Sequence, residues 1–434
     1  MVKSNGLLAP DFKTEPYWWT AAPRPTEAPG AMPERADIAI VGSGFTGLAC
    51  ALTLARAGRD VVVLEAGPAG FGASSRNAGF LGKTLKHSFS SLLENRGANY
   101  AISVYREMEA AFDCVTGLIE REKIACHMTM CGRYMAANSP RHYEIMAQEL
   151  ELRRLYLGED SEMVPKKAQH RELGSDLYHG GAVVPGLGSL HPGLYHAGLL
   201  RCARAAGARV IGHNAVSGIR RGKDGFTLDT AQGKLRATEV AVATNGYTRG
   251  ATRWLQRRVV PFRGFMIATE ELPEERLAAL MPNGRTVHDF NNNLIYLRRA
   301  PDSPRLLFGG LTGTMTDDTV AMARRLRKKL SSVLPDMADV RLSRSWAGYC
   351  SGSFDLYPHV GTRDGLHYAL GYCFAGVPMG TYLGTKMAAR ILGAPDGETV
   401  FADRPFSSKW WYRGTPWFLP AYVAKLNRLD RAGR

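Results

Sequence analysis

The glycine pattern GSGFTG at residues 42–47, which follows the apolar run of residues 36–41, constrains this chain more than any other feature. In a GxGxxG pattern the first glycine permits a tight turn, the second lets the backbone approach a pyrophosphate, and the third packs a helix against a strand. The N-terminus of that helix offers unpaired N–H groups to phosphates. The pattern therefore predicts a strand over 36–41, a helix over about 45–57 and a dinucleotide site between them.

Glu65 narrows the choice of dinucleotide. It ends a second apolar strand, predicted over 60–65, at the distance where a carboxylate accepts hydrogen bonds from ribose hydroxyls. A carboxylate there disfavours a 2′-phosphate, which leaves NAD or FAD. The place of the pattern near the start of a chain of 434 residues favours FAD.

The composition sets limits on partners and compartment. A net charge of +15 fits a solvated basic surface, steering of anionic substrates, or contact with nucleic acid or an anionic membrane. No zinc-finger or RNP-type motif is visible, so no nucleic-acid partner is expected. Seven cysteines without a CxxC pattern favour a reducing compartment. The N-terminus lacks a signal peptide and no run is long enough for a membrane span, so we expect a cytoplasmic protein.

The rest of the chain divides into helical and strand-rich stretches. We expect an extended N-terminal arm anchored by Tyr17, Trp18 and Trp19. Alternating segments within 259–310 predict an antiparallel sheet. Other expected elements are a largely helical stretch over 90–172, a loop over 180–195, two short strands and a turn followed by a buried strand at 239–243, a basic amphipathic helix at 322–330, a strand at 367–374 and a helix at 380–392.

The segment GPAGFGASSRNAGFLG at 67–82 resembles the FAD-dependent D-amino-acid oxidase superfamily, which includes glycine and sarcosine oxidases. The nearest branch is the γ-glutamylputrescine oxidase-like proteins. The resemblance covers most of residues 35–395. It continues through SLHPGLY at 189–195, ATNGYT at 243–248, VVPFRGFMIATE at 259–270, LLFGG at 306–310, WAGYCSGSFDLYPHVG at 346–361 and GYCFAGVPMGTYLGTKMAARILG at 371–393.

This resemblance implies a fold of the α/β plus α+β class. A discontinuous Rossmann-type FAD-binding domain would be joined to an antiparallel-sheet substrate domain. The implied divisions are an arm at 1–34, the FAD-binding domain at 35–90, 180–255 and 345–398, the substrate domain at 91–179 and 256–344, and a C-terminal tail at 399–434.

The glycine pattern and the resemblance together imply a set of residues around a non-covalent FAD. A cysteine link through Cys350 or Cys373 is an alternative, but both fit small buried apolar residues. The expected FAD-binding residues are Gly42, Gly44, Phe45, Thr46, Gly47, Glu65, Ala66, Gly72, Ser74, Ser75, Arg76, Asn77, Ala78, Gly79, Phe80, Leu81, Val216, Ala243, Thr244, Asn245, Gly246, Gly348, Gly376, Val377, Pro378 and Met379.

Substrate-binding residues are expected on the sheet that faces the flavin. An arginine would pair a substrate carboxylate through two parallel contacts, although a structural ion pair is the alternative for each arginine. Glycine oxidase-like members carry an arginine where this chain has Cys350, so any carboxylate recognition must come from elsewhere. The expected catalytic residues are Tyr296, Arg298, Lys83 and Tyr349; further substrate-side residues are Arg263, Phe265, His288 and Trp346.

Two lysines and a histidine complete the expectations. Sarcosine oxidase-like members place a lysine near the LLFGG strand to help oxygen react, and here Lys83 and Lys86 are substitutes for it. His191 is expected to make a hydrogen bond that stabilises its loop. If neither lysine serves, the enzyme passes electrons to another carrier.

The implied function is FAD-dependent oxidation of the C–N bond of a small amine or amino acid by hydride transfer to flavin N5, with reoxidation by O2 to give H2O2. An N-substituted glycine such as sarcosine or iminodiacetate is one substrate class, and a γ-glutamylputrescine-like amine is the alternative. Two further alternatives are a membrane-associated amine dehydrogenase that feeds a quinone and a tRNA-modifying flavoprotein. The partners are thus a small amine and O2, and the sequence predicts no oligomeric state.

Overall fold

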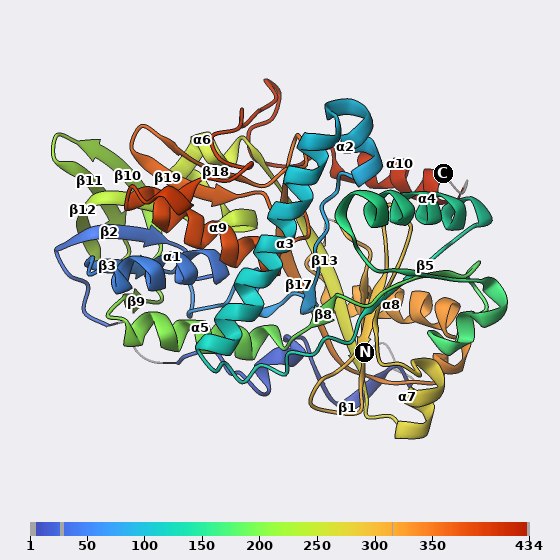
Figure 1. The fold of residues 1–434 in the computed structure, drawn as a ribbon. Coiled ribbons are helices and arrows are strands. Elements are labelled where there is room, and N and C mark those ends of the chain that lie inside the picture. Colours follow the sequence, from blue (N-terminus) through green and yellow to red (C-terminus); the bar gives the residue numbers. More distant parts are fainter. Residues whose placement is uncertain (1–5, 27–29, 315, 432–434) are drawn as a thin grey trace.

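Two large sheets and two groups of helices make up the protein, for which we use a computed structural model. It describes residues 6–26, 30–314 and 316–431, so parts of the predicted arm and tail (1–5, 27–29 and 432–434) lie outside the described residues. One sheet has eight strands and the other nine. The first lies on the left of Figure 1 with helices α1 (Phe45–Arg56) and α9 (Gly376–Ile391), and the second lies to the right.

The first sheet joins strands from distant parts of the chain in the order β10-β11-β12-β2-β3-β9, with β19 and β18 added beside β12. Strands β2, β3 and β9 run parallel. Ile38 and Ile40 on β2 are fully buried, as expected for a parallel strand covered on both faces. The strands are Arg35–Val41 (β2), Val61–Leu64 (β3), Arg209–Ile211 (β9), Val216–Gly222 (β10), Gly225–Thr230 (β11), Gly233–Val242 (β12), His359–Arg363 (β18) and Leu366–Leu370 (β19).

Strand β12 corrects one expectation. The second short strand and the buried strand predicted before residue 243 are a single strand from Gly233 to Val242. Its first half pairs antiparallel with β11, and most of its length pairs parallel with β2. Buried and exposed residues alternate in the first half of the strand, whereas its last residues are all buried. This change of pattern is why the sequence predicted two strands instead of one.

The second sheet has the order β1-β17-β13-β16-β15-β14-β5-β7-β6. The predicted antiparallel pairing holds for most neighbours, but β1–β17 and β14–β5 are parallel. A separate two-stranded sheet pairs β4 with β8. The strands are Leu8–Lys13 (β1), Phe80–Leu81 (β4), Arg133–Ala136 (β5), Glu162–Val164 (β6), Gly181–Val184 (β7), Gly188–Ser189 (β8), Val259–Thr269 (β13), Thr286–Asp289 (β14), Tyr296–Arg299 (β15), Leu306–Gly310 (β16) and Leu342–Ser353 (β17).

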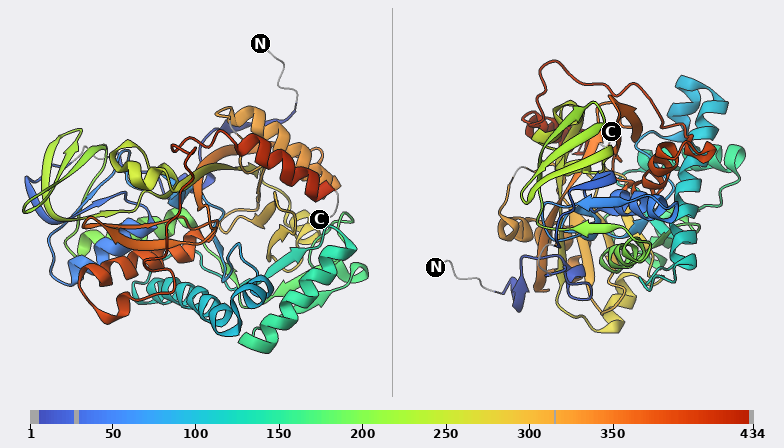
Figure 2. Two further views of the ribbon diagram at one scale, coloured as in Figure 1. Left: turned by 90° about the horizontal axis from the view of Figure 1, so that it is seen from above. Right: turned by 90° about the vertical axis from the view of Figure 1, so that its left-hand side faces the viewer.

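The helices connect and cover the two sheets. The long helix α3 crosses the front of the molecule between them in Figure 1, and the view from above in Figure 2 shows it along one side. The other helices are Phe89–Arg96 (α2), Ala98–Arg121 (α3), Pro140–Leu157 (α4), Pro192–Ala205 (α5), Arg253–Gln256 (α6), Glu274–Leu280 (α7), Thr319–Val333 (α8) and Leu419–Arg431 (α10). Within the described residues, no helix is long and apolar enough to span a membrane.

Four other predicted segments have different outcomes. The arm is anchored as predicted, because Trp18 is fully buried and Tyr17 nearly so. The predicted loop at 180–195 contains two strands, β7 and β8, and the predicted helical stretch at 90–172 contains β5 and β6. The predicted strand at 367–374 stops at Leu370, because the backbone takes positive φ at Gly371, Cys373 and Phe374.

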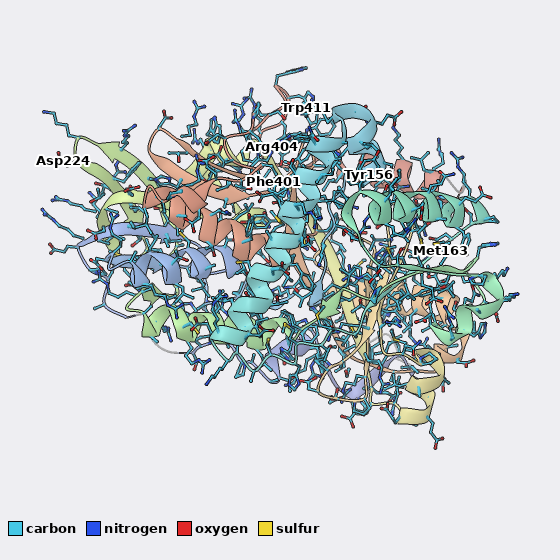
Figure 3. The ribbon with its side chains drawn as sticks, in the orientation of Figure 1. Tyr156, Met163, Asp224, Phe401, Arg404 and Trp411 are labelled. Carbon is cyan, nitrogen blue, oxygen red and sulfur yellow. The ribbon has the colours of Figure 1, made fainter. Side chains whose placement is uncertain are left out.

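The C-terminal tail crosses from one half of the molecule to the other. Figure 3 shows Phe401 and Arg404 near helix α3, with Trp411 above them. Arg404 donates a hydrogen bond of 2.6 Å to the hydroxyl of Tyr100 on that helix. At the other end, Asp430 on α10 accepts hydrogen bonds from the backbone N–H groups of Asn292 and Asn293. The tail is therefore held at both ends.

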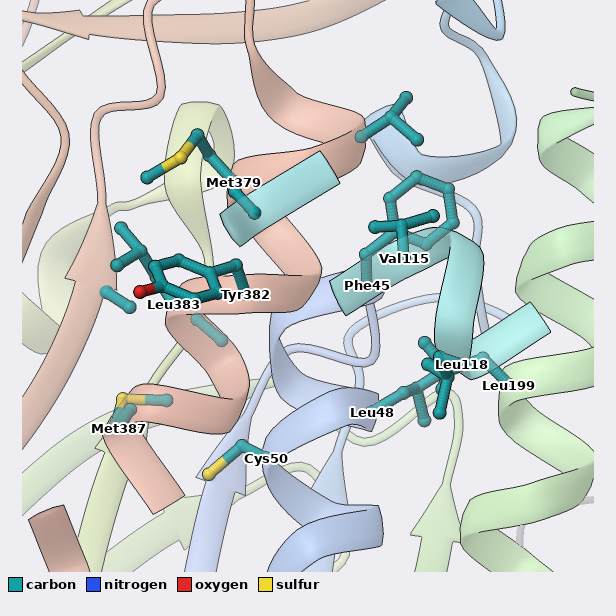
Figure 4. Close-up of a cluster of buried hydrophobic side chains, with 14 of the residues drawn as sticks. Phe45, Leu48, Cys50, Val115, Leu118, Leu199, Met379, Tyr382, Leu383 and Met387 are labelled. Carbon is teal, nitrogen blue, oxygen red and sulfur yellow. The ribbon is translucent and has the colours of Figure 1, made fainter. Parts of the chain in front are cut away.

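The largest core lies between helices α1, α3, α5 and α9. Figure 4 shows apolar side chains of this core, with Leu48 of α1 near Leu118 of α3 and Leu199 of α5, and with Met379 and Leu383 on α9. Helices α1 and α9 approach so closely that a Cβ on Gly384 would lie 2.3 Å from the backbone oxygen of Thr46. This contact fixes where α9 begins relative to the glycine turn.

We expect Gly384→Ala to destabilise the protein by about 1–3 kcal/mol, because the added methyl group overpacks the contact between α1 and α9. The measurement is the thermal midpoint of unfolding. Gly117→Ala is the control: it is also in a helix, and its Cβ would meet only the flexible end of Arg121. Alanine there should be neutral or slightly stabilising. Equal effects of the two changes would contradict the proposed packing.

Candidate functional site

The glycine turn between β2 and α1 has no room for a side chain at Gly42 or at Gly47. Gly42 has a φ of 104°, and a Cβ there would lie 2.9 Å from the oxygen of Ala243 at the end of β12. A Cβ on Gly47 would lie 1.9 Å from the oxygen of Gly42. The predicted residues 42–47 and Ala243 are thus brought together at the carboxyl end of the parallel strands, where α/β proteins bind ligands.

The first turn of α1 is linked to two other predicted segments. The backbone N–H of Phe45 donates to Ser74 Oγ over 2.9 Å, and a Cβ on Gly44 would lie 2.9 Å from the same oxygen. The hydroxyl of Thr46 lies 2.7 Å from that of Tyr372. These contacts bring the N-terminus of α1, Ser74 and the chain segment before α9 close together.

Glu65 lies at the edge of the turn, directly after β3. Its Oε2 accepts hydrogen bonds from the backbone N–H and the hydroxyl of Ser43, at 2.9 and 2.8 Å. Its backbone oxygen accepts from Asn214 N–H at 2.8 Å, which brings the chain leading to Val216 beside it. The neighbouring Ala66 is exposed. The carboxylate is therefore held against the glycine turn by its own hydrogen bonds.

His196 supports the turn from behind, and the sequence analysis missed it. It is fully buried on α5, and its Nε2 donates to the Ser43 oxygen over 2.8 Å. Its Nδ1 lies 3.3 Å from Nη1 of Arg24, a donor, so the ring is neutral with its proton on Nε2. Burial and the nearby Arg24 lower the pKa of His196 to about 4. The pattern HPGLYH offered only an indirect signal, because the contact joins residues far apart in sequence.

Three tryptophans hold the predicted FAD-binding loop after the turn. The indole N–H groups of Trp18, Trp19 and Trp346 donate to Asn77 O, Ser75 Oγ and Arg76 O, at 2.8, 2.8 and 2.9 Å. Two of the tryptophans come from the N-terminal arm and one from β17. The loop is therefore clamped between the arm and the second sheet.

Within this loop, Arg76 and Asn77 make local contacts. The Arg76 guanidinium lies over the rings of Trp19 and Phe71 and donates to Ala347 O over 3.0 Å. Asn77 Oδ1 accepts from Gly79 N–H over 2.8 Å. A Cβ on Gly348 would lie 3.1 Å from Cβ of Arg76. Of the other predicted loop residues, Gly72 and Ala78 are half-buried, Phe80 is half-buried on β4, and Leu81 is buried.

The remaining predicted cofactor residues meet where β12, β17 and β19 end. Asn245 Oδ1 accepts from Ser351 Oγ and from Gly371 N–H, which ties the three strand ends together. A Cβ on Gly246 would lie 2.6 Å from the oxygen of Cys350. Thr244 Oγ1 lies 2.7 Å from Thr248 Oγ1. The predicted segment Gly376, Val377, Pro378 and Met379 forms the first turn of α9.

The predicted catalytic residues differ in how far their polar groups are already engaged by other parts of the protein. Arg298 is 3% exposed, and its Nη1 donates to the backbone oxygens of Ala78, Gly79 and Leu190 at 3.2, 3.3 and 2.8 Å. Tyr296 donates weakly to Phe265 O over 3.4 Å. The hydroxyl of Tyr349 accepts from Arg263 Nη2 over 2.6 Å. The guanidinium of Arg298 therefore binds the predicted cofactor loop, whereas the two tyrosines lie on β15 and β17, which β16 and β13 separate in the second sheet.

The two lysines have different surroundings. Lys83 forms an ion pair of 3.3 Å with Glu109 on α3. Lys86 has no ion pair or hydrogen bond among the residues described, and its Nζ lies 4.6 Å from the ring of Phe374, which precedes α9. Its side chain is exposed, yet desolvation lowers its pKa. The Lys86 ammonium therefore lies beside the chain that leads into α9.

His191 behaves as predicted. Its Nδ1 accepts a hydrogen bond of 3.1 Å from Leu194 N–H and so caps α5. Burial lowers its pKa to about 4. The described part of the chain holds no group of three or more His, Cys, Asp or Glu side chains placed to bind a metal.

A glycine turn at the end of a parallel sheet, with a carboxylate on the next strand, is how proteins hold a dinucleotide. Joined to a second sheet through a clamped loop, it defines a dinucleotide-dependent oxidoreductase. The chain belongs to the family of FAD-dependent oxidoreductases, whose model matches residues 37–390. It is thus a flavoprotein that uses FAD to oxidise C–N bonds of amines or amino acids.

Several known proteins are similar to it. Gamma-glutamylputrescine oxidoreductase of Escherichia coli (strain K12) is 31% identical over 372 residues, which cover 85% of this chain and 86% of that protein. The crystal structure of glycine oxidase from Geobacillus kaustophilus has a TM-score of 0.73 at 24% identity and covers 87% of this chain and 99% of that one. Iminodiacetate oxidase from Chelativorans sp. BNC1 has a TM-score of 0.65 at 20% identity and covers 86% and 98%. The two structural likenesses confirm the predicted fold class, and the family model confirms FAD as the cofactor.

We expect the buried neutral His196 to make the protein less stable in acid. Its pKa is near 6.5 when unfolded and about 4 when folded, so between these values only the unfolded chain takes up the proton. The stabilisation is therefore complete above about pH 7 and declines as the pH falls, by about 2 kcal/mol at pH 5.

Urea unfolding of His196→Gln at several pH values tests this. The glutamine can still donate to Ser43 O but does not titrate, so its stability should fall less steeply between about pH 7 and 5 than that of the wild type. The exposed His170→Gln is the control and should retain the wild-type slope. Parallel slopes for all three proteins would refute a neutral His196.

Proposed function

We propose that this chain oxidises the C–N bond of a small amine that carries an anionic group, such as an N-substituted glycine, with O2 as the electron acceptor and H2O2 as product. A γ-glutamylputrescine-like amine is the second substrate class. The main support for the proposal is the turn at Gly42–Gly47, where three glycines leave the backbone without side chains so that a pyrophosphate can approach it. The net charge of +15 supports an anionic substrate.

We further propose that the residues gathered around this turn hold FAD. The proposed FAD-binding domain comprises 35–90, 180–255 and 345–398, and the proposed substrate domain comprises 91–179 and 256–344. The bare glycine turn, the helix N-terminus and the carboxylate of Glu65 fit a dinucleotide. Burial raises the pKa of both Cys350 and Cys373 to about 11, so neither thiol is a ready nucleophile. This favours non-covalent attachment.

Bound FAD would supply the two-electron acceptor for the C–N bond. The chain itself supplies orientation and a fixed electrostatic environment. Tyr349 is held by Arg263, which also pairs with Asp317. Tyr296 stands edge-on to Phe80 with ring centroids 6.2 Å apart. We propose that these tyrosines form the wall against which the amine is positioned.

A second candidate function has one observation in its favour. In the tail, Trp410 and Trp417 are 83% and 66% exposed, and the basic residues Lys409 and Arg413 stand on either side of Trp410 in the sequence. Exposed aromatics beside basic residues suit the interface of an anionic membrane. An amine dehydrogenase that feeds a quinone there would reduce a dye but consume no oxygen.

Rapid mixing tests the function directly. Purified protein should be yellow and release its flavin on acid precipitation. Mixed without oxygen with sarcosine, iminodiacetate, γ-glutamylputrescine and putrescine in turn, it should lose its flavin colour with at least one of them. Admitting oxygen should then restore the colour and give one H2O2 per amine oxidised. Bleaching that only a quinone reverses would favour the dehydrogenase, and no bleaching with any amine would refute both.

We expect Lys86→Met to slow the reaction with oxygen by about 10-fold or more, because a desolvated cation stabilises the negative charge that develops on dioxygen. Lys83→Met is the matched control, since its ammonium is already paired with Glu109. The measurement is the rate of colour return at several oxygen concentrations. A slow Lys83→Met with a normal Lys86→Met would assign the role to Lys83 instead.

A further inference from the structure

Arg133, the first residue of β5, is a buried arginine that the sequence analysis did not consider. It is 6% exposed. Its Nε donates to Thr286 Oγ1 over 3.2 Å, and its Nη2 donates to Leu81 O over 3.0 Å. These contacts attach it to β14 and to the end of the predicted cofactor loop.

The charge of Arg133 has no protein partner. Among the residues that the structure describes, no carboxylate forms an ion pair with it, and Nη1 makes no hydrogen bond. Of the other buried arginines in the described chain, Arg153, 4% exposed, pairs with Glu159, whereas Arg298 has no ion pair but its Nη1 donates to three backbone oxygens. An uncompensated buried charge is strongly destabilising, so its presence calls for an explanation.

Arg133 retains donors for a ligand. A guanidinium has five N–H groups, and only two of them are engaged here. Nη1 lies against the backbone of Gly82, where a Cβ would come within 2.9 Å. The ring of Phe80 lies 4.9 Å from the guanidinium carbon. The open donors are thus beside the loop that leads from the glycine turn.

The ring of His288 on β14 interacts electrostatically with both Arg133 and Lys86. His288 donates from Nδ1 to the oxygen of Asp289 over 2.8 Å, so the proton of the neutral ring is on Nδ1. Burial, Arg133 and Lys86 together lower the pKa of His288 to about 4. Two cations beside a neutral imidazole make this region positive at neutral pH.

We propose that Arg133 binds the carboxylate of the substrate, so that the enzyme selects amines that also carry a carboxylate. The inference rests on the proposed amine oxidation and names its substrate class. It also explains how a carboxylate is recognised without an arginine at position 350 and with the guanidinium of Arg298 engaged by backbone oxygens. The carboxylate supplies the missing counterion and accepts the open N–H groups.

The test compares carboxylates with their amides as ligands of the FAD-loaded enzyme. The probes run from acetate to glutarate, each with its amide, and binding is read from the change in the flavin absorption spectrum. The wild type should bind each carboxylate more tightly than its amide. In Arg133→Gln the carboxylate affinity should fall by about 10- to 100-fold, because a hydrogen bond to a buried charge is lost. Amide affinity should change little.

Two further variants keep the test decisive if Arg133→Gln folds poorly. Arg133→Lys retains the charge without the planar fork and should keep only part of the preference. Gly82→Ala leaves Arg133 in place but sets a methyl group against Nη1, and it should also reduce the preference. Arg153→Gln removes a buried arginine that already has a carboxylate partner, so it should leave the preference unchanged.

The outcomes separate this inference from the proposed function. A carboxylate preference that depends on Arg133 supports the site even if no amine bleaches the flavin, in which case only the proposed function fails. Amine oxidation together with equal binding of carboxylates and amides overturns the site alone. A preference that persists undiminished in folded, flavin-containing Arg133→Gln and Gly82→Ala also overturns it.

Discussion

Around the glycine turn, backbone segments pack directly against one another because the glycines place no side chains between them. The rest of the structure depends on this close packing. The oxygen of Gly42 lies where a Cβ on Gly47 would be, and the oxygen of Thr46 lies where a Cβ on Gly384 would be. These contacts bring β2, β12, α1 and α9 to one point. A ligand phosphate can approach there because no side chain intervenes. Substitution anywhere in this group therefore affects both the core and the site.

The loop after the turn transmits this constraint to the second sheet. Three indole N–H groups and the guanidinium of Arg298 all donate to residues 75–79. Because the donors come from the arm, β15 and β17, the position of the loop is set by both halves of the protein. The arm thus does more than cover the surface: Trp18 is buried at the junction. Such backbone hydrogen bonds fix orientation, which is what a redox cofactor requires from its protein.

The sequence predicted the elements whose signals are local and missed those that depend on long-range contacts. The strand, glycine turn and helix at 36–57 are readable because apolar runs and glycines lie within a few residues of one another. Strand β5 was hidden inside a stretch read as helical, since it is short and its partners β7 and β14 lie far along the chain. His196 and Arg133 were missed for the same reason. No residue near them in sequence reveals that one supports Ser43 and the other lacks a counterion.

The arginines show why burial must be weighed together with partners. From the sequence, Arg298 was the natural residue to pair a carboxylate, but its Nη1 is directed to three backbone oxygens. Burial lowers the pKa of both Arg133 and Arg298 to about 10, so both stay charged at neutral pH. The difference lies at Nη1, which in Arg298 donates to backbone oxygens but in Arg133 makes no hydrogen bond within the described residues, so that its N–H groups remain open to a ligand. Arg133 keeps three open N–H groups, and the proposed substrate carboxylate would accept them and neutralise the charge.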